Sequence, residues 1–275
     1  MKFGFSLESG YKLPMAQVLD LLADAGFCAV SPVWKRDDTL KETLRMAIER
    51  GLAIQSIHGP LKGIPALWSQ DAAIAQPVLE DFMQVAADCA EFGGKVMVVH
   101  SWYGKDYTFC RENLCFDHFD TLVSYAQQLG ICVAFENLEG PEFLVALMEH
   151  YEGCPTVGLC WDSGHESCYN PGWDFLSSYG DRLIMTHLND NLGLTDPDGR
   201  LVSTDDLHLF PGHGIINWAD TLGKLQASKK QDILNLELKI RPKGDLCKLD
   251  LYSQLPLDQY FREAYQNACK VFQGY

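Results

Sequence analysis

The chain has 275 residues, of which 47% are hydrophobic and 21% charged, and its formal net charge is −15 at pH 7. A chain of this length can bury a substantial core, and no apolar run is long enough to cross a bilayer, so we expect no association with a membrane. The negative field repels phosphate backbones at long range, which argues against a nucleic acid partner.

Strand-like and helical patterns then alternate along the chain. The strand-like runs are Lys2–Leu7, Phe27–Val33, Ala53–His58, Lys95–His100, Ile131–Asn137, Thr156–Asp162, Arg182–Leu188 and Asp232–Lys239. The helical patterns that follow them are Met15–Ala25, Leu40–Arg50, Asp71–Phe92, Asn113–Leu129, Glu142–Tyr151, a short one near Trp173–Tyr179, Trp218–Ala227 and Leu257–Phe272. Several of these helices are followed directly by glycine, which is typical of a helix C-terminus.

Eight strand–helix units without a linker or a change in composition predict one closed parallel barrel over residues 1–275. The alternative is an open doubly wound sheet, which normally carries a glycine-rich phosphate motif after its first strand. The residues after the first strand, Glu8-Ser9-Gly10-Tyr11-Lys12, contain no such motif. We therefore predict an α/β fold, a single (β/α)8 TIM barrel, with the long connections Asn189–Asn217 and Ile240–Pro256 covering its active face.

Ten cysteines raise the question of disulfide bonds. Cys28, Cys132 and Cys160 stand in strand-like runs and Cys89 in a helical one, where cysteine behaves as a small hydrophobic residue. The sequence has no C-x-x-C pair, and a chain of this length does not need disulfides for stability. We expect reduced thiols and a cytoplasmic location.

Six consecutive strand ends carry histidine, aspartate or glutamate. All strands of a parallel barrel end at the same mouth, so these side chains are expected to meet there. Because buried charges need a counter-charge, a shared divalent cation explains their convergence. The strand-end residues are His58, His100, Glu136, Asp162, His187 and Glu237, and the loops just above add His165, Asp206 and His208.

Each of these residues has a structural alternative. Asp162 ends an apolar run and precedes Gly164 and His165, so it could equally be a helix cap or a turn residue. His118 and His150 fall on predicted helices, and we interpret them as surface or packing residues. Mixed imidazole and carboxylate ligands suit Zn²⁺ or Mn²⁺, with Mg²⁺ or Co²⁺ left open and between one and three ions expected.

Three motifs of the sequence are similar to those of a known family. They are Asp-Ser-Gly-His from Asp162, His-Leu-Asn-Asp from His187, and Asp-x-His…Pro-Gly-x-Gly-x-x-x-Trp from Asp206. In these motifs the chain resembles the xylose-isomerase-like TIM barrel superfamily, from about Phe3 to about Glu237. That group includes sugar and sugar-phosphate isomerases and epimerases, and the apurinic endonucleases of the endonuclease IV type. One departure is His213, where relatives commonly carry glutamate.

The ketose epimerase pattern in that superfamily implies one metal site and one acid–base pair. By this resemblance Glu136, Asp162, His187 and Glu237 bind the metal, and Glu136 and Glu237 also exchange a proton with the substrate carbon. His165 would donate a hydrogen bond to a substrate oxygen. A metal that chelates a carbonyl and its neighbouring hydroxyl acidifies the C–H group between them.

The endonuclease IV pattern implies three zinc ions and phosphodiester hydrolysis. All of its ligand positions are present in this sequence. They are His58, His100 and Glu136 for one ion; Glu136, Asp162, His187 and Glu237 for a second; and His165, Asp206 and His208 for a third.

The composition of charged residues argues against the endonuclease alternative. The chain has 22 basic and 37 acidic residues, whereas a DNA-processing enzyme needs a basic track. Aromatic residues near the predicted mouth fit a small polyol better. They are Trp34, Trp68, Trp102, Tyr103, Trp161 and Trp173, and we expect part of this set to lie in the barrel core. We therefore predict a metal-dependent isomerase or epimerase of a sugar, sugar phosphate or cyclitol. A zinc phosphodiesterase ranks second and a non-catalytic metal-binding barrel third, and a homo-oligomer remains open.

Overall fold

The strands of the chain run parallel and form a ring. The computed structural model describes residues 1–8, 10–241 and 250–275, so residues 242–249 of the predicted connection Ile240–Pro256 lie outside the described residues. The strands are β1 (Phe3–Leu7), β2 (Ala29–Pro32), β3 (Ala53–Ile54), β4 (Ser56–His58), β5 (Val96–His100), β6 (Cys132–Glu136), β7 (Val157–Asp162), β8 (Leu183–His187) and β9 (Leu234–Leu236).

Two sets of hydrogen-bonded strands make up the ring, in the orders β3-β2-β1-β9 and β4-β5-β6-β7-β8. Parallel bridges between Val33 and His58 and between Leu188 and Leu236 join the two sets at both seams. The predicted strand Ala53–His58 is divided at Gln55, whose side chain donates to the Ile233 carbonyl across the ring (3.0 Å). With β3 and β4 counted as this one strand, the predicted (β/α)8 barrel is confirmed.

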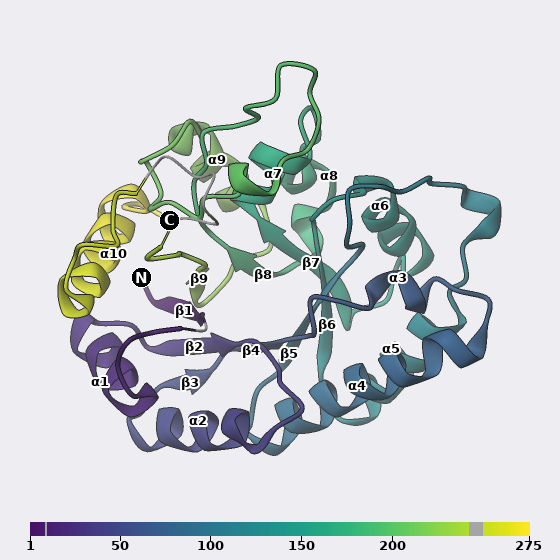
Figure 1. Cartoon of the computed structure of the whole chain (residues 1–275), viewed down its shortest axis with the longest axis horizontal. Coiled ribbons are helices and arrows are strands. Elements are labelled where there is room, and N and C mark those ends of the chain that lie inside the picture. The colour runs from purple at the N-terminus through teal and green to yellow at the C-terminus, as the bar shows by residue number, and fades with distance from the viewer. Residues whose placement is uncertain (9, 242–249) are drawn as a thin grey trace.

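Helices surround the ring of strands (Figure 1). They are α1 (Met15–Ala25), α2 (Asp38–Glu49), α3 (Ile64–Leu67), α4 (Ala72–Glu91), α5 (Asp117–Gln128), α6 (Pro141–His150), α7 (Ser163–Tyr169), α8 (Phe175–Tyr179), α9 (Trp218–Ala227) and α10 (Leu257–Val271), with short 3₁₀ turns at Arg111–Asn113, Gly180–Arg182 and Ser203–Asp205. In the described part of the chain, no helix combines the length and the apolar character that a bilayer span requires. No disulfide joins the cysteines of the described residues.

Helix α5 begins later than the sequence predicts. The predicted helix starts at Asn113, but residues 111–113 form a separate 3₁₀ turn and α5 starts at Asp117. Asp117 and Asp120 both lie in the first turn of α5. Acidic side chains there interact favourably with the helix dipole, which explains why the helix begins at this point.

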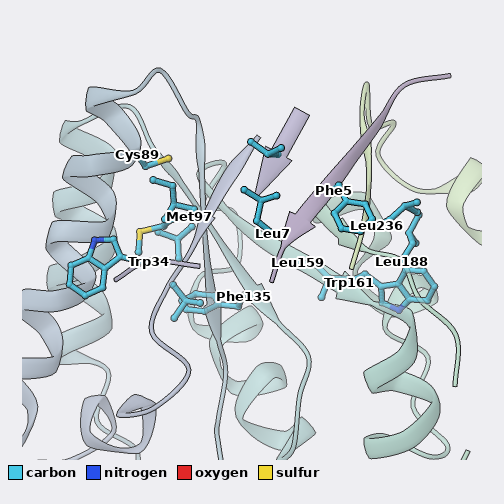
Figure 2. Close-up of a cluster of buried hydrophobic side chains, with 14 of the residues drawn as sticks. Phe5, Leu7, Trp34, Cys89, Met97, Phe135, Leu159, Trp161, Leu188 and Leu236 are labelled. Atoms are coloured by element: carbon cyan, nitrogen blue, oxygen red, sulfur yellow. The ribbon is translucent and has the colours of Figure 1, made fainter. Parts of the chain in front are cut away.

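The main core fills the space between the strands and the helices (Figure 2). In β1, Phe3 and Phe5 point toward α10, where Phe5 packs edge-to-face against Phe261 at a ring-centroid distance of 5.2 Å. Each such aromatic side chain contributes about 1.5–3 kcal/mol through burial. The alternate residues of β1, Gly4 and Ser6, face the inside of the ring, since side chains alternate along a strand.

A smaller apolar cluster of Val98, Ala134, Cys160 and Met185 occupies the inside of the ring on β5 to β8. Residues two positions apart on a strand share a face. The same inner face therefore continues, at the carboxyl ends of these strands, into His100, Glu136, Asp162 and His187. The strand pattern thus places the predicted ligands directly above an apolar plug.

Candidate metal centre

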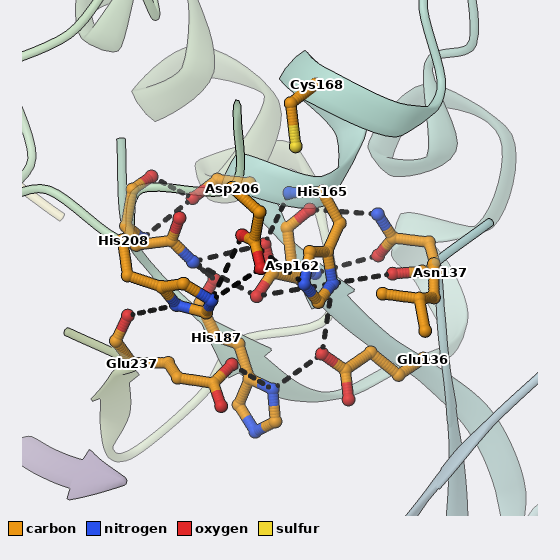
Figure 3. Close-up of polar contacts among 12 residues, drawn as sticks. Glu136, Asn137, Asp162, His165, Cys168, His187, Asp206, His208 and Glu237 are labelled. Carbon is orange, nitrogen blue, oxygen red and sulfur yellow. Dashed lines mark hydrogen bonds and ion pairs between the residues drawn. The ribbon is translucent and has the colours of Figure 1, made fainter. Parts of the chain in front are cut away.

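Glu136 stands at the centre of the polar residues at the barrel mouth. Its side chain is fully buried, and its Oε2 lies 3.0 Å from His58 Nε2 and 3.4 Å from His100 Nε2. Its Oε1 lies 2.9 Å from His187 Nδ1 and 3.4 Å from His165 Nδ1. Imidazole groups from four different elements therefore converge on one carboxylate. Figure 3 shows two of them, His165 and His187, beside Glu136.

A second carboxylate, Glu237, meets the same cluster from just beyond β9. Its Oε2 lies 3.1 Å from His187 Nδ1. One ligand atom from each of Glu136, Asp162, His187 and Glu237 lies within 4.8 Å of the other three. This spacing allows all four to coordinate one ion.

A third carboxylate, Asp206, lies on the long connection after β8. Its Oδ1 is 3.0 Å from His208 Nε2 and 3.7 Å from His165 Nε2, and the Lys239 ammonium is 3.9 Å from Oδ2. His165, Asp206 and His208 form another compact ligand group, and His58, His100 and Glu136 form a third. The structure thus brings all the predicted candidates together, and we call these residues the ligand layer: His58, His100, Glu136, Asp162, His165, His187, Asp206, His208 and Glu237.

The hydrogen bonds of three histidines in the ligand layer leave a nitrogen of each ring turned toward the carboxylates, where a cation could bind. In each, Nδ1 lies against a backbone carbonyl, which can only accept, so Nδ1 carries the hydrogen. The contacts are His58 to Gly59 (2.7 Å), His165 to Asn137 (3.0 Å) and His208 to Glu237 (2.9 Å). The Nε2 atom of a neutral imidazole then presents a lone pair to a carboxylate oxygen. Two lone pairs repel each other unless a metal ion or a proton lies between them. A ring with its Nδ1–H bonded to a carbonyl and its Nε2 turned toward the site has the orientation that metal-binding histidines adopt.

The charge balance of the ligand layer also fits a bound cation. Burial, with smaller contributions from the carboxylates of Glu237 and Glu136, raises the pKa of the Asp162 carboxyl to about 7 although His165 acts to lower it. Burial also opposes ionisation of Glu136, but His187 and His100 outweigh it and hold the pKa of that carboxyl well below its usual range. Buried carboxylates crowded in this way need positive charge. Imidazole and carboxylate donors fit a divalent ion such as Zn²⁺ or Mn²⁺.

Asp162 is both a helix cap and a member of the ligand layer, so the two alternatives left open by the sequence coexist. Its Oδ1 accepts the backbone N–H of His165 (2.7 Å) and starts α7 without a loop. The prediction of a loop at His165 was therefore wrong, and this imidazole lies in the first turn of α7. The Asn189 amide donates to both Asp162 oxygens (3.1 and 3.0 Å), and the Asn137 side chain accepts the Asp162 backbone N–H (2.8 Å).

These two asparagines were not predicted as part of the site. The signal was present in the sequence, since each follows a strand-end ligand within two residues, in Glu136-Asn137 and His187-Leu-Asn189. They orient the carboxylate of a candidate metal ligand, and such outer partners are nearly as important to metal sites as the ligands themselves.

Asp190 fastens the long connection that carries Asp206 and His208. Its buried carboxylate accepts the backbone N–H groups of Gly212 (2.9 Å) and Ile216 (3.2 Å) and the Trp218 indole N–H (2.8 Å). A Cβ atom at Gly214 would collide with this carboxylate and with a backbone carbonyl, so only glycine fits there. The Pro-Gly-x-Gly-x-x-x-Trp motif therefore closes the loop around Asp190.

His208 has an unusual backbone conformation in this connection. Its φ is +50°, and it is the only non-glycine residue of the described chain with positive φ. The Asn191 side chain accepts its backbone N–H (3.2 Å), which holds the left-handed conformation that turns the ring toward Asp206. His213, where the sequence departs from its relatives, instead contacts the Tyr252 hydroxyl through Nδ1 (2.8 Å).

A cavity of about 470 Å³ opens above the ligand layer, and we call it the metal-site cavity. Six members of the layer line it, but Glu136, Asp162 and His187 lie beneath. Its other walls include Glu8, Glu139 and Tyr169, which the sequence did not single out. A small polar molecule can therefore enter and contact Glu237 and the histidines directly.

The six aromatic residues predicted near the mouth lie mostly in the core, where part of them was expected, rather than on the cavity wall. Of the six aromatic residues proposed, only Tyr103 lines the metal-site cavity within the described chain. Trp34, Trp68 and Trp161 are buried in the main core, where each indole N–H finds an acceptor at 2.8–3.0 Å. A buried indole that is hydrogen-bonded in this way packs between strands and helices without cost to its polar group.

Comparisons with known proteins agree with this geometry. A family model described as a xylose isomerase-like TIM barrel matches residues 19–264. The uncharacterized protein y4fM of Sinorhizobium fredii is 27% identical over 268 residues, which cover 84% of this chain and 83% of the relative. The solved structure of the IolI protein with a bound zinc atom has a TM-score of 0.76 at 19% identity and covers 100% of this chain and 99% of that one. D-psicose 3-epimerase from Clostridium cellulolyticum has a TM-score of 0.74 at 14% identity and covers 99% of both chains.

Proposed function

The chain belongs to the xylose isomerase-like TIM barrel family, and on that basis we propose that it is a metal-dependent isomerase or epimerase of a sugar, sugar phosphate or cyclitol. The observation that carries this proposal is the position of the ligand layer at the floor of an open cavity. Structural metal sites are normally closed by protein ligands, whereas catalytic sites leave a position for substrate. The sugar epimerases and the zinc-bound protein among the solved relatives support the same class.

Glu136, Asp162, His187 and Glu237 are the residues that would hold the catalytic ion, which we propose to be zinc or manganese. When bound there, a divalent ion polarises a substrate carbonyl and acidifies the neighbouring C–H group. The residues His58, His100, Asp206 and His208 remain as further ligands of ions or substrate.

Glu237 is the group that we assign to proton removal. Its side chain is 20% exposed and lines the metal-site cavity. Burial opposes its ionisation, but His187 and His208 outweigh it and hold the pKa of its carboxyl well below its usual range, so it is in the ionised form that a proton acceptor needs. Glu136 is the proposed second member of the pair, and His165, on the cavity wall, would donate a hydrogen bond to a substrate oxygen.

Deuterium exchange tests this proposal. Ketoses, inososes and their phosphates would be incubated in D₂O with the protein and Zn²⁺, Mn²⁺ or Mg²⁺, and incorporation next to the carbonyl measured by NMR. We expect exchange with at least one of them, and a loss of about 10²–10⁴-fold in Glu237→Gln together with lower metal content. Glu149→Gln, at an exposed glutamate of α6, is the control and should change neither. Absence of exchange with every metal would contradict the proposal.

A second candidate, a zinc phosphodiesterase, is supported by one specific observation. The ligand layer divides into three groups that match a three-zinc pattern, with Glu136 shared between two of them. We expect no cleavage of a duplex with an abasic site at physiological salt, because the net charge of −15 opposes DNA binding. Cleavage without any proton exchange would reverse this ranking, and tight metal binding with neither activity would favour a non-catalytic barrel.

A further inference from the structure

A second cavity of about 180 Å³ adjoins the metal-site cavity, and we call it the lateral groove. The two cavities share Leu7, Glu8, Val33 and Leu61 as lining residues. The groove lies where β1 and β2 end, and α1 and α2 form its outer wall. A molecule seated over the ligand layer can therefore extend sideways into the groove.

The shared wall is mostly apolar. Leu7, Val33 and Leu61 separate the two cavities, and Leu40 and Met15 continue the apolar surface outward. Leu61 is a large hydrophobic residue that is 44% exposed at this position. The lining also includes the polar residues Lys35, Thr39 and Thr43. Apolar surface such as that of Leu61 gains free energy when an apolar group covers it, so the apolar part of the groove is suited to a hydrophobic part of a ligand.

The volumes show that a free hexose leaves space unused. A hexose has twelve non-hydrogen atoms, and at the ~30 Å³ that one water occupies in the liquid it would fill at most about 360 Å³. The metal-site cavity alone has about 470 Å³. The groove adds about 180 Å³, which is comparable to the ~150 Å³ apolar cavity that holds a benzene molecule. A six-carbon group fits the groove while the sugar occupies the ligand layer.

Glu8 marks the junction of the two cavities. One of its oxygens accepts the Ile240 backbone N–H (3.3 Å), which fixes the side chain near the barrel mouth. Its carboxylate is thus a hydrogen-bond acceptor at the point where a polar sugar would meet an apolar substituent.

We propose that the lateral groove binds an apolar group attached through an oxygen of the sugar, so that the substrate is a hydrophobic sugar conjugate and not a free monosaccharide. This inference rests on the proposed function, since it takes the sugar to sit over the ligand layer. An aryl and an alkyl substituent share the required chemistry.

Binding of matched ketose ethers to the zinc-loaded protein tests the proposal. Isothermal titration calorimetry would compare the 6-O-phenyl, 6-O-hexyl and 6-O-methyl ethers of D-fructose, which keep the carbonyl that the proposed function requires. We expect phenyl, hexyl or both to bind at least about tenfold more tightly than methyl, since each buried methylene is worth a comparable factor. The stronger of the two identifies the substituent as aromatic or aliphatic.

A variant that fills the groove provides the control. Thr43 on α2 lines only the lateral groove, and its hydroxyl donates to the Thr39 carbonyl (2.9 Å). Thr121 on α5 makes the same local contact, with the Asp117 carbonyl (2.8 Å), far along the chain from the groove. Thr43→Phe should reduce the phenyl-to-methyl affinity ratio to about one, and Thr121→Phe should leave that ratio as in the parent protein. Circular dichroism checks that Thr43→Phe and Thr121→Phe are folded. If Thr43→Phe does not fold, Thr39→Phe replaces it, because Thr39 lines the groove from the same helix.

The proposal would be overturned if the three ethers bound with equal affinity or if none of them bound. It would also be overturned if both phenylalanine variants lost the preference equally. Proton exchange on free ketoses separates this outcome from failure of the proposed function. That assay depends on Glu237 and the metal and does not require an occupied groove.

Discussion

Replacing Asp190 with asparagine tests how the long connection after β8 is held over the ligand layer. Asp190 Oδ1 accepts the N–H groups of Asn191 (3.0 Å) and Ile216 (3.2 Å), and Oδ2 accepts those of Gly212 (2.9 Å) and Trp218 (2.8 Å). An asparagine keeps one oxygen and turns an NH₂ group toward the other two donors. Two buried donors then lose their acceptor, at about 1–3 kcal/mol each. We expect the free energy of unfolding to fall by about 2–6 kcal/mol.

Urea denaturation followed by circular dichroism measures this change. Asp196→Asn is the matched control, because Asp196 lies on the same connection, is only half-buried and accepts the backbone N–H of Asp198 (2.8 Å). Its substitution should change the free energy of unfolding by no more than about 0.5 kcal/mol.

The same variant has a consequence for the metal centre. Asp206 and His208 are positioned by this connection, so a loosened connection in Asp190→Asn should lower the number of zinc ions retained per chain, measured by mass spectrometry of the metal. The reasoning is refuted by a stability loss below about 1 kcal/mol, or by a loss equal to that of the control.

Three further predictions concern the loop, the metal and the thiols. Gly214→Ala should destabilise the protein by several kcal/mol, because the added Cβ collides with the Asp190 carboxylate. Gly223→Ala, in the open middle of α9, is the control and should stabilise the protein by about 0.5–1 kcal/mol. Equal effects of the two substitutions in urea denaturation would contradict the collision. Removing metal with a chelator should lower the melting temperature, and free zinc at 100 times its Kd should restore about 2.7 kcal/mol, whereas an unchanged melting curve would mean that the ligand layer holds no ion. Burial raises the pKa of the Cys89 thiol to about 12, so Ellman's reagent should modify the exposed Cys269 in the folded protein and Cys89 only after unfolding.

Periodicity along the chain was sufficient to predict the barrel and the position of the ligand layer. Parallel strands end at one mouth, and alternate residues of a strand share a face, so His100, Glu136 and His187 were expected to meet before any contact was known. The roles predicted for these residues stay predictions. The same local reasoning did not tell which of the aromatic residues near the mouth belong to the core. Trp34 does, because a residue near a strand end can turn outward into the core if its N–H finds an acceptor there.

Only the tertiary structure decided which atoms face each other. The carbonyl that takes the Nδ1 hydrogen of His208 belongs to Glu237, 29 positions away, and the backbone that Gly214 must accommodate surrounds Asp190. The lateral groove likewise forms where residues of α1 and α2 meet residues at the ends of β1 and β2. Such contacts join residues that are distant along the chain, and their geometry depends on how whole elements pack, which the local alternation of apolar and polar residues does not encode.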